Sequence, residues 1–376
     1  MTSPCNALIF IQKTKNTLIE AVSSMKQTVA SLLVCALLAG CASGSNPFAP
    51  ETTADDNGTG TGTDDGTGTD TGNGTTGGGT TTVDSSVSVP SEIAGNVSNV
   101  TYDAANGTLV VEGVSLDDVP YSATYRRAPS LDQDGYVAFT IQEDPLDRHY
   151  TAYARESTDG SVRATTVGSP GPRNRSFMGA HFERDGSYDP PEVTEDSGIV
   201  TYAGRYVAVT NVGDLNGSDL LPAGVTDPEL LVPQALVVHG DAFINADFAD
   251  NTVEGNIYNR ELLDTNLNVI SELPSVVLVV TDIEANGTFS GTVEYDISDP
   301  LSGTTTNTEI GSYSGVFGGT DASSVAGAVE LDEFDGTDNN LDFETELESG
   351  VFVLDQCGTG ASPAVCNSVN PNVGTP

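Results

Sequence analysis

The sequence predicts an all-β protein with two β-rich parts, the second of them an eight-stranded antiparallel β-barrel. Gly (41 residues) and Pro (19) are frequent, and Val and Thr are abundant throughout, a composition that favours short strands and turns over helices. From residue 91 on, apolar and polar residues alternate in short runs that are separated by turn residues. In the second part these runs are regularly spaced, with Gly at the bends, as in a closed antiparallel sheet.

The first β-rich part is expected at residues 89–195. Two runs, Val97–Asp103 and Thr108–Val114, flank the pair Asn106-Gly107, which suits a tight hairpin because both residues tolerate positive φ. No helical period longer than two turns appears in this part. Further strands are expected at Tyr136–Gln142, His149–Arg155, Val162–Val167 and Phe177–Arg184.

The second part is expected at residues 196–376. About eight strands form a barrel whose interior side chains just fill it, so we expect a plugged core and not a pore. Closure would also remove the unpaired edges that an exposed sheet must protect. The runs are Ile199–Thr210, Ala235–His239, Phe243–Phe248, Thr252–Tyr258, Val276–Ile283, Thr288–Tyr295, Ile310–Phe317, Val325–Leu331 and Gly350–Leu354.

The N-terminal region has the pattern of a bacterial lipoprotein signal. Residues 25–41 hold one cation, a short apolar run and then Leu-Ala-Gly-Cys, which matches a lipobox. We therefore expect residues 1–40 to be a signal region that starts at Met25, and Cys41 to be the acylated mature N-terminus. Residues 52–82 contain only Thr, Gly, Asp, Asn and Ala and cannot bury apolar surface, so 41–88 is expected to be a disordered, lipid-anchored tether.

The charge of the chain is strongly negative, −41 at pH 7. This argues against nucleic acid as a partner, because phosphate binding needs clustered cations. After Lys26 every cation is Arg, and eight of these arginines lie between Arg126 and Arg184. Two interpretations are open: the arginines neutralise neighbouring carboxylates, or they form a cationic face for an acidic partner, with Arg126 and Arg127 as candidate ligand-binding residues.

Residue patterns for catalysis and for metal or cofactor binding are missing from the sequence. The three histidines lie far apart, no Gly-x-Ser-x-Gly motif occurs, and the Lys of a phosphate loop is absent, so we expect no enzyme, no resident metal and no cofactor. The segment Asp214–Asp219 alternates oxygen-bearing residues that could bind calcium, but it lacks the closing Glu of an EF-hand. Four tyrosines either pack the strands or line a binding surface: Tyr121, Tyr125, Tyr150 and Tyr153.

Cys357 and Cys366 are the cysteines that follow Cys41 in the chain. Beyond the inner membrane the compartment is oxidising, and we expect the two thiols to form a disulfide that keeps the last strand from fraying.

The second part resembles the barrel of transferrin-binding protein B and related surface lipoproteins. Residues 204–206 (Gly-Arg-Tyr), 246–248 (Ala-Asp-Phe) and 252–255 (Thr-Val-Glu-Gly) are similar to early barrel strands of that family. The late-barrel pattern Gly-x-Phe-aromatic-Gly-Pro-x-Ala-x-Glu-x-Gly-Gly is matched in register by Phe317, Gly319, Ala322 and Gly327. Its proline, its glutamate and the first of its paired glycines are replaced by Thr320, Ser324 and Ala326.

The resemblance implies a β-rich handle before the barrel, display on the outer membrane, and capture of a protein or of an iron-carrying ligand for an outer-membrane receptor. In haem-capturing relatives a Tyr can supply a ligand, which would concern the four tyrosines above. An alternative from another class is an acidic envelope or adhesion lipoprotein that captures nothing.

Overall fold

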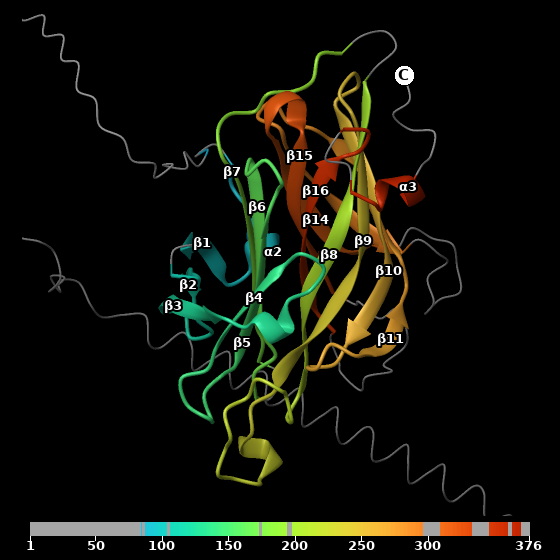
Figure 1. The fold of residues 1–376 in the computed structure, drawn as a ribbon. Helices are drawn as coiled ribbons and strands as arrows, with labels where there is room; N and C mark the ends of the chain where they lie inside the picture. The colour runs from blue at the N-terminus through green and yellow to red at the C-terminus, as the bar shows by residue number, and fades with distance from the viewer. Residues whose placement is uncertain are drawn as a thin grey trace, which may run out of the picture. The chain divides into compact units, whose positions relative to one another are not determined.

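The computed structural model describes Asp84 and residues 87–103, 106–172, 175–193, 198–295, 309–332, 346–359 and 363–369 (Figure 1). The expected signal region, Cys41 and the tether up to residue 83 lie outside the described residues. The described strands form two sheets within one compact unit.

The first sheet, called the handle below, is a meander of seven antiparallel strands in sequence order. Its outer strands β1 and β7 approach each other at their starts, where the Asn96 N–H donates to the Met178 carbonyl at 2.8 Å. A short helix, α2 (Ser91–Ala94), lies just before β1. The strands are β1 (Val97–Asp103), β2 (Thr108–Val114), β3 (Pro120–Arg127), β4 (Val137–Ile141), β5 (Tyr150–Glu156), β6 (Val162–Ser169) and β7 (Phe177–Arg184).

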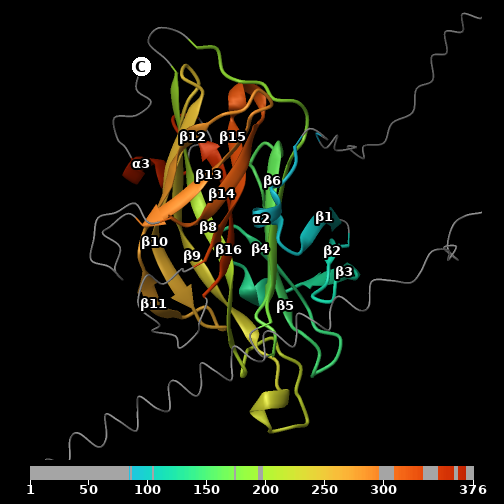
Figure 2. The ribbon, with the colours of Figure 1, turned by 180° about the vertical axis from the view of Figure 1, so that it is seen from behind.

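The second sheet closes into an antiparallel barrel of eight strands. The ring runs β8, β9, β10, β12, β13, β14, β15 and β16, and β16 pairs with β8 to complete it. The strand β11 forms a hairpin on β10 outside the ring. Figure 2 gives the rear view of β10–β14. The bounds are β8 (Ile199–Asp214), β9 (Gln234–Asp247), β10 (Thr252–Leu263), β11 (Val269–Leu273), β12 (Val276–Asp282), β13 (Thr288–Tyr295), β14 (Glu309–Gly318), β15 (Ser324–Leu331) and β16 (Glu348–Gln356).

The expected all-β class and the eight-stranded antiparallel barrel are confirmed. Two strands were not expected from the sequence, β3 and β11. Four of the five residues of β11 are exposed, so its apolar pattern is weak. In β3 the residues Tyr121, Ala123 and Tyr125 face the handle core and alternate with exposed residues, so the sequence does contain a strand pattern there that was not predicted. The two runs Ala235–His239 and Phe243–Phe248 belong to the single strand β9, which continues through Gly240 and Asp241. Asp241 interrupts the apolar pattern there, although it is nearly buried and pairs with Arg205.

The interior of the barrel is filled by side chains. The rings of Tyr202, Phe248 and Phe289 surround Phe317 with centroid distances of 5.4, 5.3 and 5.2 Å. Phe289 lies opposite Gly315 on the neighbouring strand, where a Cβ would meet the ring at 2.4 Å. A glycine under an aromatic ring lets the large side chain lie flat against the sheet, so the barrel has a solid core and not a lumen.

A buried ion pair lies inside this core. Arg260 donates to Glu348 at 2.7 Å, and both side chains are fully buried. The hydroxyl of Tyr206 donates to the other oxygen of Glu348, also at 2.7 Å. The strand register of β10 shifts between Tyr258 and Glu261, and the shift lies next to Arg260. Because the charges are paired and hydrogen-bonded, their burial does not leave an isolated charge in the core.

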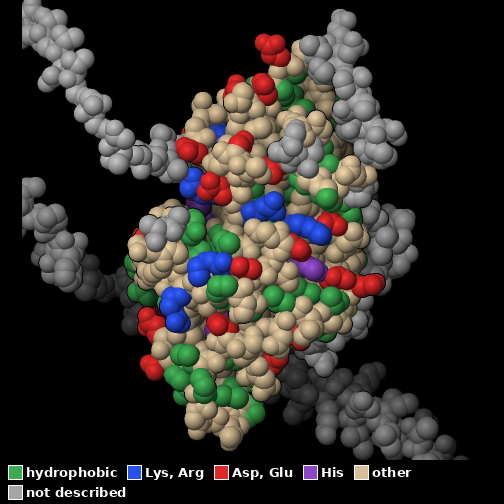
Figure 3. All heavy atoms as spheres, viewed as in Figure 1, with side chains coloured by type: hydrophobic (Ala, Val, Ile, Leu, Met, Phe, Trp, Pro, Cys, Tyr) green, Lys and Arg blue, Asp and Glu red, His purple; other side chains and the backbone are tan. Residues whose placement is uncertain are grey.

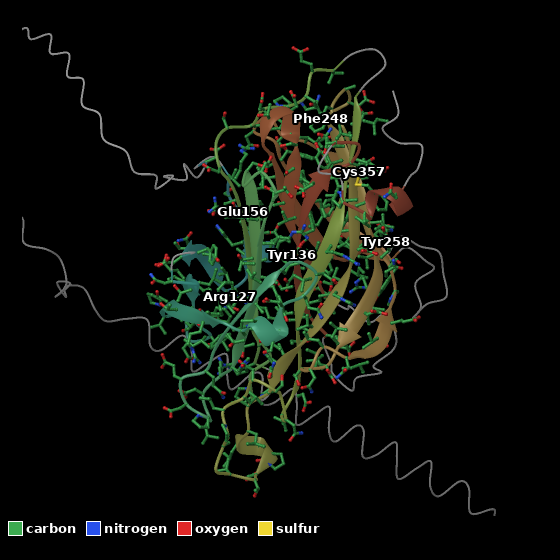
Figure 4. All side chains as sticks on the ribbon, viewed as in Figure 1. Arg127, Tyr136, Glu156, Phe248, Tyr258 and Cys357 are labelled. Carbon is green, nitrogen blue, oxygen red and sulfur yellow. A yellow bond between two sulfur atoms is a disulfide. The ribbon has the colours of Figure 1, made fainter. Side chains whose placement is uncertain are left out.

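The handle packs on the outer wall of the barrel through a shared hydrophobic cluster. Tyr136 of the handle lies between the two sheets (Figure 4). Its hydroxyl donates to the Arg205 carbonyl at 2.8 Å and accepts from the Val353 N–H at 3.0 Å. Burial raises the pKa of Tyr136 to about 12, so the phenol stays protonated and can donate. The handle and the barrel therefore share a core.

The expected turn between two late barrel strands is present at β14 and β15. Phe317 is fully buried, and Gly319 has φ +78°, a conformation that favours glycine. The turn contacts the handle, because Ser323 donates to Asp159 at 2.5 Å. Burial alone would raise the pKa of Asp159, but hydrogen bonds from Ser323, Ser157 and Ser161 outweigh it and lower that pKa to about 2.

Local contacts hold the first and last described segments of this unit. Cys357 and Cys366 form the expected disulfide, which ties the end of β16 to the short helix α3 (Cys366–Val369). At the other end, Val87 and Val89 are partly buried against the shared cluster. No helix among the described residues has the length and apolarity needed to cross a membrane.

Candidate binding surface at the loop end

One end of the molecule gathers several loops of the handle and a long loop of the barrel. Successive antiparallel strands bring alternate connections to the same end, so the described residues of three handle loops lie together: 115–119, 142–149, and 170–172 with 175–176. The connection 215–233 between β8 and β9 joins them, since it shares a pocket with Pro170–Pro172. We call the residues 114–119, 142–149, 170–172, 175–176 and 215–233 the loop end; it lies toward the bottom of Figure 1.

Hydrogen bonds join these loops to one another. Arg175 donates to the Leu116 carbonyl at 3.2 Å, and Arg148 donates to the Arg175 carbonyl at 2.6 Å. The Leu221 N–H donates to the side chain of Gln142 at 2.7 Å. Loops that are fixed to each other present one preformed surface, which lowers the entropic cost of binding.

The loop end exposes large apolar side chains. Five of them lie there, with exposed fractions of 37–54%. Figure 3 shows hydrophobic side chains gathered at this lower end of the molecule. Contiguous exposed apolar surface on a soluble domain marks interaction sites. The five residues are Val114, Val119, Leu146, Leu215 and Leu230.

The segment Asp214–Asp219, the calcium candidate, belongs to this end. Its side chains do not converge, because Asp214 accepts from the Asn216 N–H while Ser218 donates to the Thr265 carbonyl. Asp219 instead hydrogen-bonds the buried His149 of the handle at 2.9 Å. Burial alone would raise the pKa of Asp219, but the hydrogen bonds from His149 and Thr140, together with the nearby charges of His149 and Arg126, outweigh it and lower that pKa. Among the described residues no three His, Cys, Asp or Glu side chains form a metal-binding group.

The candidate ligand-binding residues Arg126 and Arg127 have different surroundings. Arg127 forms a two-pronged ion pair with Asp132 at 2.7 and 2.9 Å and lies over the ring of Phe139. The hydrogen bond to Asp132 raises the pKa of Arg127. Arg126 is exposed on β3. Arg127 therefore stabilises the handle, whereas Arg126 is accessible to a partner.

Several other arginines are paired with carboxylates. Arg163 lies 3.2 Å from Glu183, and the buried Arg184 pairs with Asp84. On the face drawn in Figure 3, cationic side chains lie among hydrophobic ones and next to acidic ones. The pairing neutralises Arg163 and Arg184, whereas Arg126 and Arg175 remain exposed.

The four tyrosines divide between the two faces of the handle sheet. Tyr121, Tyr125 and Tyr150 pack on the inner face with Phe177, and the hydroxyls of Tyr121 and Tyr125 are 2.9 Å apart. Burial raises the pKa of all three phenols. Tyr153 lies on the opposite face, in the cluster shared with the barrel. Tyr121 and Tyr150 are half-buried and line a recess beside Arg148, so they border the loop end.

His239 links the handle to the barrel. One ring nitrogen lies 2.9 Å from Asp134 of the handle, and the other lies 2.8 Å from Glu261 of β10. His149 and His239 are thus both engaged with carboxylates across the two sheets. Their partners are 70 and 105 residues away in the sequence, which is why sequence reasoning missed these contacts.

No protein-family model matches the sequence, and no curated protein matches it. Solved structures do resemble the chain, at low identity. A transferrin-binding protein B variant from Haemophilus parasuis Hp5 is 12% identical with a TM-score of 0.33, and the match covers 66% of this chain and 51% of that one. The chain thus spans about half the length of that protein.

Two further structures are similar in the same way. Isotype 1 transferrin-binding protein B from serogroup B Neisseria meningitidis is 14% identical with a TM-score of 0.29, covering 66% of this chain and 49% of that one. A structure described as a surface lipoprotein is 18% identical with a TM-score of 0.30, covering 68% and 96%. These structures are of transferrin-binding protein B and of a surface lipoprotein, the group of proteins that the barrel motif resembles.

Proposed function

We propose that this chain is a lipid-anchored protein of the outer-membrane surface that binds a protein or iron-carrying ligand through its loop end. The observation that carries the proposal is the group of exposed apolar side chains on loops that are hydrogen-bonded to each other. The lipobox before Cys41 and the resemblance of the barrel motif to surface lipoproteins support the location.

The loop end suits a protein partner better than a small molecule. Its apolar residues are spread over several loops and are surrounded by charged side chains, as in the polar rim of a protein interface. In the described part of the barrel, aromatic and aliphatic side chains fill the interior, so it does not compete as a binding site. Binding would then deliver the ligand to an outer-membrane receptor.

The test is a pull-down with residues 77–376 as bait. Growth medium and envelope extracts, from iron-replete and iron-starved cultures, would be offered to the parent protein and to the double variant Val119→Asp with Leu146→Asp. The control is Val280→Asp, which places the same charge at a 58% exposed position of the barrel strand β12. A partner held by parent and control but lost from the double variant supports the proposal.

Two results would contradict it. A partner that binds all three proteins equally does not use the loop end. A parent protein that captures nothing under either iron condition, while cells that carry it adhere to surfaces better than cells that lack it, would favour the adhesion alternative.

The arginines are tested separately with the partner so identified. Arg126→Ala is expected to leave the thermal midpoint unchanged because the side chain is exposed, so any loss of affinity reports a contact with the partner. Arg127→Ala removes the ion pair with Asp132 and is expected to lower the thermal midpoint of unfolding, whether or not it changes the affinity. Unchanged affinity of both variants would restrict the arginines to neutralising carboxylates.

A further inference from the structure

A cavity of about 220 Å³ opens in the handle away from the loop end. The strands β1 and β7 are the outer strands of the sheet, and they contact each other at their starts through Asn96 and Met178. The cavity is lined by the far ends of the same strands, at Tyr102 of β1 and Glu183 of β7. The cavity therefore lies at the end of the curled sheet where β1 and β7 do not pair with each other.

One side of the cavity is apolar. Val100, Val137 and Ala154 belong to or pack against the hydrophobic core on the inner face of the handle. Tyr102 stands at the mouth with 44% of its surface exposed, and its ring meets Phe139 edge-on at 5.8 Å. An aromatic ring at the mouth and aliphatic walls provide an environment for an apolar group of modest size.

The other side is formed by two cross-strand pairs of β6 and β7. Arg163 lies opposite Glu183, and Thr165 lies opposite His181. The Arg163 Nε is 3.2 Å from a Glu183 oxygen, yet its N–H does not point at that oxygen and the buried atom has no hydrogen bond. His181 Nε2 is 3.9 Å from Glu183, too far for a hydrogen bond. One donor of the cavity lining, the Arg163 Nε–H, is therefore without a partner among the described residues.

The charges at the cavity are balanced. Arg163 and Arg155 contribute cations, although the guanidinium of Arg155 also lies over the ring of Tyr136 at 5.3 Å, and Glu183 and Glu156 contribute anions. A ligand with only a carboxylate would meet both glutamates, and a ligand with only an ammonium group would meet both arginines. A ligand that carries both groups next to each other can satisfy both signs at once.

We propose that this cavity binds a small zwitterion with an apolar side chain, that is, a free amino acid of the aromatic or branched aliphatic class. The carboxylate would accept from Arg163, the ammonium group would donate to Glu183, and the side chain would lie against Val100, Val137 and Ala154. The cavity is below the range of roughly 300–1,000 Å³ that is usual for drug-sized ligands, so the ligand must be small. This site is additional to the loop end and does not depend on the function proposed for it.

The test is calorimetric titration of residues 77–376 with four probes: phenylalanine, 3-phenylpropionate, phenethylamine and glycine. The first three share an aromatic body, and the last has the charges without it. Phenylalanine is expected to bind with a Kd below roughly 1 mM, and each of the other probes at least about tenfold more weakly. Absence of saturable phenylalanine binding, or equal affinity for all the aromatic probes, would overturn the proposal.

Two variants locate the binding. Glu183→Gln keeps the shape of the side chain and removes its charge, so it is expected to weaken phenylalanine and to strengthen 3-phenylpropionate. Ala154→Leu fills the cavity and is expected to abolish binding of both. The control Glu143→Gln removes a carboxylate beside Tyr121 and Tyr150, outside this cavity, and should bind like the parent. Circular dichroism checks the folding of each variant; unaltered preference in folded Glu183→Gln would exclude Glu183 as the ammonium partner and so refute the assigned site.

Discussion

The substitution Phe317→Ala tests both the barrel core and its connection to the handle. The ring is fully buried and makes three aromatic contacts, with Tyr202, Phe248 and Phe289. Truncating a buried Phe costs roughly 3–5 kcal/mol, and the three ring contacts place this site toward the upper end. A loss of this size is expected to lower the thermal midpoint by about 10 °C or more.

The number of unfolding transitions carries further information. The Phe317 carbonyl accepts from Arg184 of the handle at 2.9 Å, and the two sheets share one hydrophobic cluster. We therefore expect the handle and the barrel to unfold together, in the parent and in the variant.

The measurement is differential scanning calorimetry of residues 77–376, with circular dichroism as a second probe. Val280→Ala is the control, since this side chain is 58% exposed and its truncation should change the free energy of unfolding by less than about 0.5 kcal/mol. If Phe317→Ala melts within a degree of the parent, the ring does not support the barrel. If the barrel transition alone moves while a separate handle transition stays in place, the shared core does not couple the two sheets.

Three further predictions concern a titrating carboxyl, the disulfide and the lipid anchor. Burial raises the pKa of Glu330 to about 8, so the unfolded chain releases this proton near pH 4.5 while the folded chain retains it. The free energy of unfolding should therefore fall between pH 5 and pH 8, by about 1.4 kcal/mol per pH unit or less. Glu330→Gln should flatten that slope in urea titrations, and an unchanged slope would exclude Glu330 as its source. Cys357→Ser with Cys366→Ser should destabilise the protein by roughly 2–3 kcal/mol under oxidising conditions, measured by urea unfolding, and should not differ from the reduced parent; a double variant as stable as the oxidised parent would contradict this. Cys41→Ser should abolish metabolic labelling with a palmitate analogue, and equal labelling of variant and parent would rule out Cys41 as the acylated residue.

The sequence predicted strands that pack on a hydrophobic core with one or both faces. The bounds of β1, β2 and β7 agree with their apolar runs because one face of each strand packs on a core. The strand β11 carries little such signal, since four of its five side chains are exposed and it lies at the edge of the sheet. The strand β3 lies between β2 and β4 and does alternate, with Tyr121, Ala123 and Tyr125 toward the core, yet it was not predicted. Hydrophobic periodicity reports burial and not hydrogen bonding, so an exposed edge strand such as β11 is missed.

The candidate sites were less predictable, because they depend on contacts between distant segments. The clustering of Arg126 to Arg184 is a real feature of the sequence, but composition cannot reveal that Arg127 pairs with Asp132 or that Arg184 is buried. The loop end combines segments from residue 114 to residue 233, which only the order of the strands brings together. The handle cavity requires in addition the curvature of the sheet, which no local pattern specifies.

The contrast between the two sheets explains why binding is assigned to the handle. The barrel has eight strands, a ring size whose interior is filled by its own side chains, and the pair of Arg260 and Glu348 occupies polar space there as well. Part of its outer wall is covered by the handle. The handle has seven strands and no ring closure in the described part of the chain, so its inner face remains accessible between β1 and β7. Because the cavity and the loop end lie toward opposite ends of the handle strands, a small ligand in the cavity would leave the loop end free. Saturating phenylalanine should therefore leave capture of the loop-end partner intact in the pull-down, and a loss of capture would contradict the independence of the two sites.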